Sequence, residues 1–205
     1  MRLVCPPRPR LSRLVLTAAL AAVLLLVAPA AAHAGQQEPR LARGHETRAL
    51  VGSVGQSWRF GWNDAGLSTS DVIFAGIHPQ LGWFQTSRFE LYGEGTLQIY
   101  WRPHAAVFAG LMGIGGRYHF ADDRAWTPYA LVSAGLGWTS LDIVEIDRVF
   151  NFQVVWGAGL RQITRRGPGW MIEFRNHHIS NAGTRGENIG INSATLVAGV
   201  HWVLR

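Results

Sequence analysis

The sequence predicts an all-β protein, an eight-stranded antiparallel transmembrane β-barrel, and three observations support this fold. Eight segments of about 12 to 16 residues alternate apolar and polar side chains with a period of two, which is typical of strands with two different faces. Such strands are long for a soluble sheet but sufficient to cross a membrane when tilted. Hydrophobic residues make up 48% of the chain, yet after residue 34 no apolar run approaches the roughly 20 residues of a spanning helix.

Residues 1–34 have the organisation of a secretory signal peptide. Four arginines precede an apolar core from Leu14 to Val27. Ala32-His33-Ala34 then supplies a small-x-small cleavage site. We therefore expect the mature chain to begin at Gly35. The single cysteine, Cys5, lies within the signal, and export without disulfides is compatible with a bacterial envelope protein.

The formal charge of +6 overstates the basic character of the mature protein. All 19 basic residues are arginines and four belong to the signal, so 15 arginines face 13 acidic residues and the mature net charge is +2. The arginines form no cluster and match no nucleic-acid-binding motif, which argues against nucleic acid as a partner.

Residues 35–46 are expected to form a short periplasmic N-terminal segment, and residues 47–205 the barrel. The first four strands are expected at 47–60, 71–84, 89–101 and 105–120, and Pro79 suggests a bulge or a weak edge in the second. Their apolar faces carry, in order, Leu50, Val54, Trp58 and Phe60; Ile73, Ala75, Ile77, Leu81 and Trp83; Phe89, Leu91, Leu97, Ile99 and Trp101; and Ala106, Phe108, Met112, Ile114, Tyr118 and Phe120.

The last four strands are expected at 126–139, 148–163, 170–180 and 192–204. An acidic loop at 140–147, a turn at 164–169 and a loop at 181–191 separate them. Their apolar faces carry, in order, Ala130, Val132, Ala134, Leu136 and Trp138; Phe150, Phe152, Val154, Trp156, Ala158 and Leu160; Trp170, Ile172 and Phe174; and Ala194, Leu196, Ala198, Val200, Trp202 and Leu204.

Two further features favour a membrane barrel over a soluble, lipocalin-like barrel with its faces exchanged. Tryptophans lie near many strand ends, as expected of interfacial girdles: Trp58, Trp62, Trp83, Trp101, Trp126, Trp138, Trp170 and Trp202. The opposite faces carry charged and polar residues that would fill a small lumen: Glu90, Glu94, Gln98, Arg117, Gln153, Arg161, Glu173 and Arg175.

The apolar face of residues 170–180 becomes polar at its end, where His178 and Ser180 follow Asn176. His178 and Ser180 share the outward face with Cα atoms roughly 7 Å apart, so the imidazole can reach the hydroxyl. Asn192 has the same outward parity on the next strand, across the loop. A serine beside a histidine is the usual arrangement for acyl transfer.

The residues His178-Ile179-Ser180-Asn181-Ala182-Gly183, followed by Gly190-Ile191-Asn192, resemble the lipid A 3-O-deacylases of the outer membrane, the acyloxyacyl hydrolase-like family. The His-x-Ser-Asn core is short but fairly specific, and the weaker barrel pattern covers the whole mature chain. The resemblance implies an eight-stranded barrel with its site on the outer wall. It also implies Ser180 as nucleophile and His178 as base, with Asn181 and the backbone NH near Gly183 stabilising the oxyanion.

The sequence departs from this family at the third member of the triad, where the family enzymes carry glutamate and this chain has Asn192. An asparagine can hold the imidazole ring through its amide oxygen but cannot stabilise an imidazolium by charge. Glu187, in the loop, is the alternative, although Asn192 fits better by parity and spacing.

Several nearby residues have structural explanations. His177 and His201 have inward parity, which predicts lumen residues, and Asn181 and Gly183 also suit a turn. Arg185 could pair with lipid A phosphates or be solvated.

The sequence thus predicts an outer-membrane serine esterase that removes a fatty acyl chain, at the 3 position, from the lipid A of lipopolysaccharide. Neither a cofactor nor a metal is expected, and the partners are lipid A and the membrane. The oligomeric state stays open, a homodimer included. The alternative function is a non-catalytic eight-stranded outer-membrane barrel with a structural or adhesion role.

Overall fold

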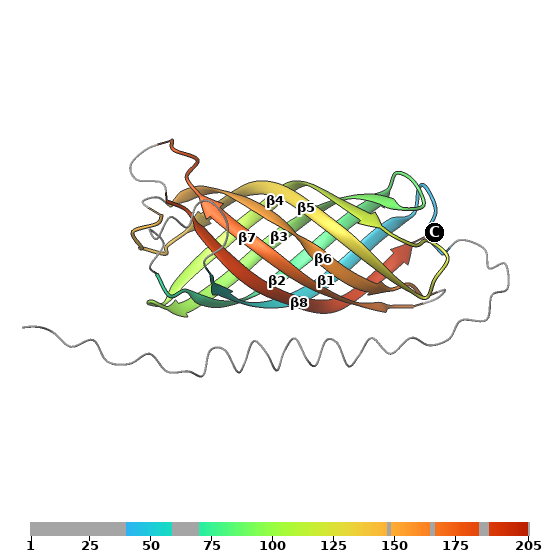
Figure 1. Cartoon of the computed structure of the whole chain (residues 1–205), viewed down its shortest axis with the longest axis horizontal. Coiled ribbons are helices and arrows are strands. Elements are labelled where there is room, and N and C mark those ends of the chain that lie inside the picture. Colours follow the sequence, from blue (N-terminus) through green and yellow to red (C-terminus); the bar gives the residue numbers. More distant parts are fainter. Residues whose placement is uncertain (1–39, 59–69, 147–148, 165–166, 185–188, 205) are drawn as a thin grey trace, which may run out of the picture. The chain divides into compact units, whose positions relative to one another are not determined.

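The computed structural model describes residues 40–58, 70–146, 149–164, 167–184 and 189–204. Eight antiparallel strands each pair with their sequence neighbours, and pairing of the first with the last closes the barrel (Figure 1). The strands are β1 (Glu46–Ser57), β2 (Ile73–Phe84), β3 (Phe89–Arg102), β4 (Ala106–His119), β5 (Trp126–Thr139), β6 (Phe150–Gln162), β7 (Gly169–Ser180) and β8 (Ile191–Leu204). The predicted fold class is confirmed.

Some predictions fall outside the described residues. These are the signal peptide 1–34, residues 35–39 of the N-terminal segment, the end of the first expected strand with Phe60, and Trp62, Arg185 and Glu187. Within the described ranges, no helix is long and apolar enough to cross a membrane.

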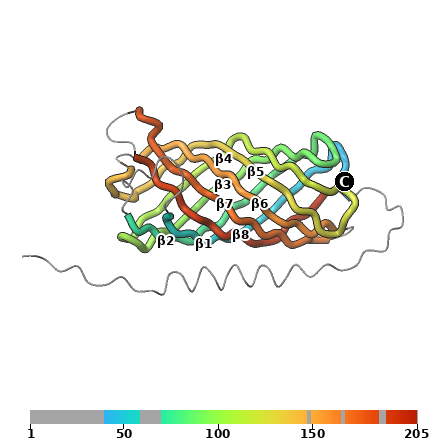
Figure 2. Tube along the Cα trace, in the orientation of Figure 1, coloured from blue at the N-terminus to red at the C-terminus, as the bar shows by residue number. Residues whose placement is uncertain are grey.

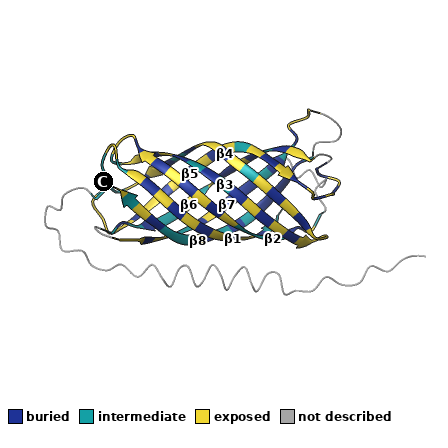
Figure 3. Ribbon diagram, turned by 180° about the vertical axis from the view of Figure 1, so that it is seen from behind, coloured by how far each residue is buried: buried dark blue, intermediate teal, exposed yellow. Residues whose placement is uncertain are grey.

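The two faces of the wall differ as a membrane barrel requires. Exposed and buried residues alternate along the strands (Figure 3). Outward apolar side chains are well exposed, for example Ile99 at 62% and Trp170 at 62%, whereas Glu90 and Arg161 are fully buried. A soluble barrel would show the opposite distribution, so the lipocalin-like alternative is wrong.

The prediction for the fourth strand was wrong in its first half. Phe108 and Met112 are buried in the lumen, whereas Ile114 is 77% exposed. The register of β4 against both neighbours shifts by one residue around Gly113, which is a β-bulge. A one-residue shift moves every later side chain to the other face, so Tyr118 still points outward and Arg117 inward, as predicted.

The suggestion of a bulge or edge at Pro79 was also wrong. Pro79 is paired with Leu50 of β1. The β2–β3 register has the same offset before Pro79, at Ile77↔Leu97, as after it, at Gln80↔Glu94. Because the barrel is closed, β2 has no free edge.

Charged residues fill the middle of the lumen as ion pairs. Arg161 Nη1 lies 3.0 Å from Glu90 Oε2 and Arg117 Nη1 lies 3.5 Å from the same oxygen. Arg175 makes a two-pronged contact with Glu94, at 2.9 and 3.0 Å. Pairing of this kind is what makes buried charge tolerable, and it confirms the predicted lumen network.

Apolar clusters seal the lumen at both ends. Leu41, in the segment expected to be a simple lead-in, is fully buried against Phe84 and Ile163. At the other end the loop between β5 and β6 turns back into the barrel and buries Leu141, Ile143 and Ile146 beside Phe74, Tyr100, Ile179 and Ile191. This loop and the junction of β7 with β8 lie at the end opposite the C-terminus (Figure 2).

Candidate active site

The final residues of β7 and the first of β8 place a polar group on the outer wall near the rim. His178 and Asn192 are direct partners across the two antiparallel strands. His178 Nδ1 lies 3.1 Å from Asn192 Oδ1. Because an amide oxygen can only accept, Nδ1 carries the proton and the lone pair resides on Nε2. This is the tautomer that a general base needs.

Gly190 brings Ser180 and His178 together. A Cβ atom built on Gly190 would lie 3.2 Å from Ser180 Cβ, 3.2 Å from His178 Nε2 and 2.7 Å from His178 Cε1. Both side chains therefore pack against the same small patch of backbone at Gly190. Gly190 adopts φ +70°, and its NH donates to the Glu145 carbonyl at 3.2 Å.

Asn181 and Gly183 form a tight turn directly after β7. The Gly183 NH donates to Asn181 Oδ1 at 2.8 Å, and the Thr184 NH and hydroxyl both donate to the Asn181 carbonyl. Asn181 is buried. With its oxygen directed at Gly183, the Nδ2 end of the amide points the other way, whereas the Gly183 NH is already used inside the turn.

The structure adds two residues to the group that the sequence analysis did not assign. Asn176 Nδ2 donates to Asn192 Oδ1 at 3.3 Å. The indole Nε1 of Trp58 donates to Asn176 Oδ1 at 2.8 Å. Trp58 is held here by its backbone NH, which donates to the Asn192 carbonyl at 3.0 Å, and by an edge-to-face contact with Phe174.

Comparisons with known proteins decide the family. The family model described as "Lipid A 3-O-deacylase (PagL)" matches residues 52–201. The chain belongs to the lipid A 3-O-deacylase (PagL) family. It is accordingly a protein of the cell outer membrane, in a family of hydrolases that act on lipid A. No curated protein matches the chain by sequence.

Solved structures support the barrel fold. The crystal structure of the outer membrane enzyme PagL is 20% identical, with a TM-score of 0.54, and the match covers 75% of this chain and 97% of that one. Neisserial surface protein A (NspA) is 14% identical, with a TM-score of 0.56 and coverage of 77% and 96%.

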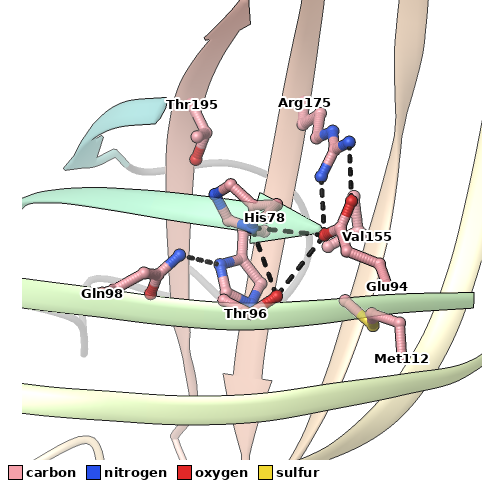
Figure 4. A pocket seen from close by; sticks show the side chains of 9 residues that line it. His78, Glu94, Thr96, Gln98, Met112, Val155, Arg175 and Thr195 are labelled. Carbon is pink, nitrogen blue, oxygen red and sulfur yellow. Dashed lines mark hydrogen bonds and ion pairs between the residues drawn. The ribbon is translucent and has the colours of Figure 1, made fainter. Parts of the chain in front are cut away.

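The structure separates the polar group of His178, Ser180 and Asn192 on the outer wall from the histidines inside the lumen. His177 lies in the lumen, with Nε2 3.1 Å from Gln153 and Nδ1 3.4 Å from Gln98. His78 and Thr96 lie beside the Arg175–Glu94 pair and line a small internal cavity (Figure 4). The other ring nitrogen of His78 lies 2.8 Å from the Ser53 hydroxyl. His201 is buried and contacts the Gln162 carbonyl. The predicted lumen positions of His177 and His201 are confirmed.

The described part of the chain holds no group of three or more His, Cys, Asp or Glu side chains placed to bind a metal. Glu187, the alternative third member, lies outside it. Of the five site residues predicted from sequence, the structure thus places His178, Ser180 and Asn192 together on the outer wall and Asn181 and Gly183 in the adjoining turn. Outward parity could have identified Asn176, but no sequence signal linked it to Trp58.

Proposed function

We propose that this PagL-family protein hydrolyses the ester-linked acyl chain at the 3 position of lipid A, with Ser180 as nucleophile and His178 as general base. The observation that carries the proposal is the 3.1 Å contact between His178 Nδ1 and Asn192 Oδ1. It supports a base with its lone pair on Nε2, on the same outward face as Ser180. Polar groups that face lipid are costly and are retained mainly where they function.

The proposed reaction has two halves. His178 Nε2 removes the Ser180 hydroxyl proton as the oxygen attacks the ester carbonyl carbon, giving a tetrahedral oxyanion. When this intermediate collapses, the ester bond breaks, and the sugar hydroxyl leaves with the proton held by His178. Water then attacks the acyl-enzyme with His178 again as base, releasing the fatty acid and restoring Ser180.

The oxyanion is assigned to Asn181. Oδ1 accepts from the Gly183 NH, so the amide is oriented with its Nδ2 donor end away from Gly183. The Gly183 NH therefore acts by orienting the amide. A donor of this kind contributes about 3 kcal/mol when preorganised.

The location of the group suits an acyl substrate. Ser180 and His178 pair across the sheet with Phe152 and Val154 of β6, which present apolar surface to the membrane. Phe152 continues into an edge-to-face ladder with Phe150 and Trp138. An acyl chain lying in the outer leaflet could run along this surface to the serine near the rim.

The test is mass spectrometry of lipid A from a Gram-negative host that expresses the wild type or Ser180→Ala. We expect the wild type to remove one acyl chain, assigned to the 3 position by fragmentation, and Ser180→Ala to leave lipid A intact while folding normally by heat-modifiable gel mobility. A fluorophosphonate probe should label Ser180 in the wild type. Unchanged lipid A with the wild type, or full activity in Ser180→Ala, would refute the proposal.

A further inference from the structure

Four side chains on the outer wall form one directional chain of hydrogen bonds. It runs from Trp58 Nε1 to Asn176 Oδ1, from Asn176 Nδ2 to Asn192 Oδ1, and from His178 Nδ1 to the same oxygen. Trp58 directly follows β1, Asn176 and His178 lie on β7, and Asn192 lies on β8. The chain is thus assembled at the seam where the first strand meets the last.

The chemistry at the Trp58 end fixes the direction of every later bond. An indole NH can only donate, so it selects the oxygen of the Asn176 amide. The nitrogen of that amide is then turned towards Asn192 and selects the Asn192 oxygen. This oxygen in turn accepts only from a protonated Nδ1 of His178.

Burial gives this ordering its strength. Although Asn176 and Asn192 have outward parity, their exposed fractions are only 2% and 7%. Trp58 lies beside them, anchored to the Asn192 carbonyl and to Phe174. At such low exposure, a reversed amide would place two donors or two acceptors face to face, which costs about 1–3 kcal/mol per unsatisfied group.

We propose that Trp58 and Asn176 are positioning residues that set the orientation of the Asn192 amide and, through it, the tautomer of His178. This inference rests on the proposed function for the role of His178, but the tautomer itself can be measured separately. A carboxylate at position 192 has two equivalent oxygens and accepts in either orientation. An amide must be oriented, and in this chain Trp58 and Asn176 orient it.

The sharpest variant is Asn176→Asp, which keeps size and shape. The new carboxylate still accepts from Trp58 but offers no donor to Asn192. The Asn192 amide is expected to rotate, so that its NH₂ donates to the carboxylate and to His178 Nδ1. The proton of His178 then moves to Nε2, and the base is lost.

The direct readout is the ¹⁵N spectrum of the imidazole rings in the full-length mature barrel in micelles, with His178→Gln used to assign the signal. We expect a protonated Nδ1 in the wild type and a protonated Nε2 in Asn176→Asp. A wrong tautomer in a serine hydrolase triad lowers kcat by about 10⁴-fold. We expect a loss of at least about 100-fold in kcat with KM within twofold, because the acyl-binding surface is untouched.

The second test separates orientation from mere packing. Trp58→Phe keeps an aromatic ring over Phe174 but removes the donor, and we expect about a tenfold loss of kcat in the native background, the effect of roughly one hydrogen bond. In the Asn192→Asp background the same change should cost less than twofold. Trp170→Phe, on the outward face at the far end of β7, is the control and should change neither quantity.

Each outcome bears on the inference. Equal losses of kcat from Trp58→Phe in the native and Asn192→Asp backgrounds would indicate a packing role and overturn the inference. An Asn176→Asp protein whose His178 keeps its proton on Nδ1 would also overturn it. If the wild type leaves lipid A intact but the tautomer changes as expected, the orienting chain stands and the proposed esterase activity fails.

Discussion

Gly190 offers a quantitative test of the site because a single methyl group would be directed at the base. In Gly190→Ala the new Cβ would lie 2.7 Å from His178 Cε1 and 3.2 Å from both His178 Nε2 and Ser180 Cβ. Carbon atoms pack at about 3.5–4.0 Å, so the ring must retreat by about 1 Å. The Nδ1–Oδ1 contact of 3.1 Å would then exceed the limit of a hydrogen bond.

Two effects are expected, and they differ in size. Alanine at φ +70° strains the backbone by about 1–2 kcal/mol, which lowers the free energy of unfolding modestly. Displacement of a catalytic group by 1 Å can cost about 100-fold in rate. We therefore expect kcat on lipid A to fall about 100-fold, measured by mass spectrometry of the released fatty acid.

Gly167→Ala is the matched control. Gly167 has a similar φ of +78°, and among the described residues beyond its chain neighbours no atom lies within 4 Å of its Cβ position. It lies in the turn at the other end of β7. It should reproduce the loss of stability in urea without the loss of rate. If Gly190→Ala keeps a kcat within threefold of Gly167→Ala, the packing of Gly190 against His178 does not position the base.

Two further predictions concern stability. Glu90→Gln should lower the free energy of unfolding by about 3–5 kcal/mol in urea titrations of vesicle-inserted barrel, because Arg117 and Arg161 lose a shared buried carboxylate; a change below 1 kcal/mol would contradict the assigned role. The pKa of Asp122 is lowered below its usual 3.8, chiefly because the Ser87 hydroxyl donates to it at 2.6 Å. A depressed carboxyl pKa stabilises the fold above the unfolded value and loses this effect as pH falls through the folded value. Ser87→Ala should therefore be less stable than the wild type at pH 6, by under about 1 kcal/mol, and the gap should close as pH falls through the folded-state pKa of Asp122; a gap independent of pH would refute the assignment.

The faces of most strands could be predicted because lipid and lumen impose opposite demands on alternate residues. On β3, for example, Glu90 and Glu94 are buried opposite Leu97 and Ile99, which are exposed. The alternation failed at β4, where Phe108 and Met112 line the lumen while Leu111 and Ile114, on either side of Gly113, both point outward. An apolar side chain fits either environment, so the pattern there carried no information about the bulge.

The sequence predicted the part of the candidate site that lies on the β7–β8 hairpin. His178, Ser180 and Asn192 follow from parity on two adjacent strands, which needs only local pairing. Trp58 contacts Asn176 across a sequence separation of 118 residues, and this contact depends on how β1 registers against β8 when the barrel closes. Nothing in the local sequence of β1 specifies that register.

In the proposed mechanism, the same closure accounts for the use of an asparagine at position 192. A carboxylate on the outer wall carries a charge that lipid makes costly unless it is paired, whereas an amide is neutral but has two unlike ends. Covering the amide with Trp58 and Asn176 removes the ambiguity of its orientation without adding a charge to the membrane face. A neutral amide, however, gives the imidazolium no electrostatic support during turnover. Asn192→Asp should therefore stabilise the charged intermediate, but its added charge should make the barrel harder to insert into the membrane. An Asn192→Asp protein with unchanged kcat would mean that this support does not limit the rate.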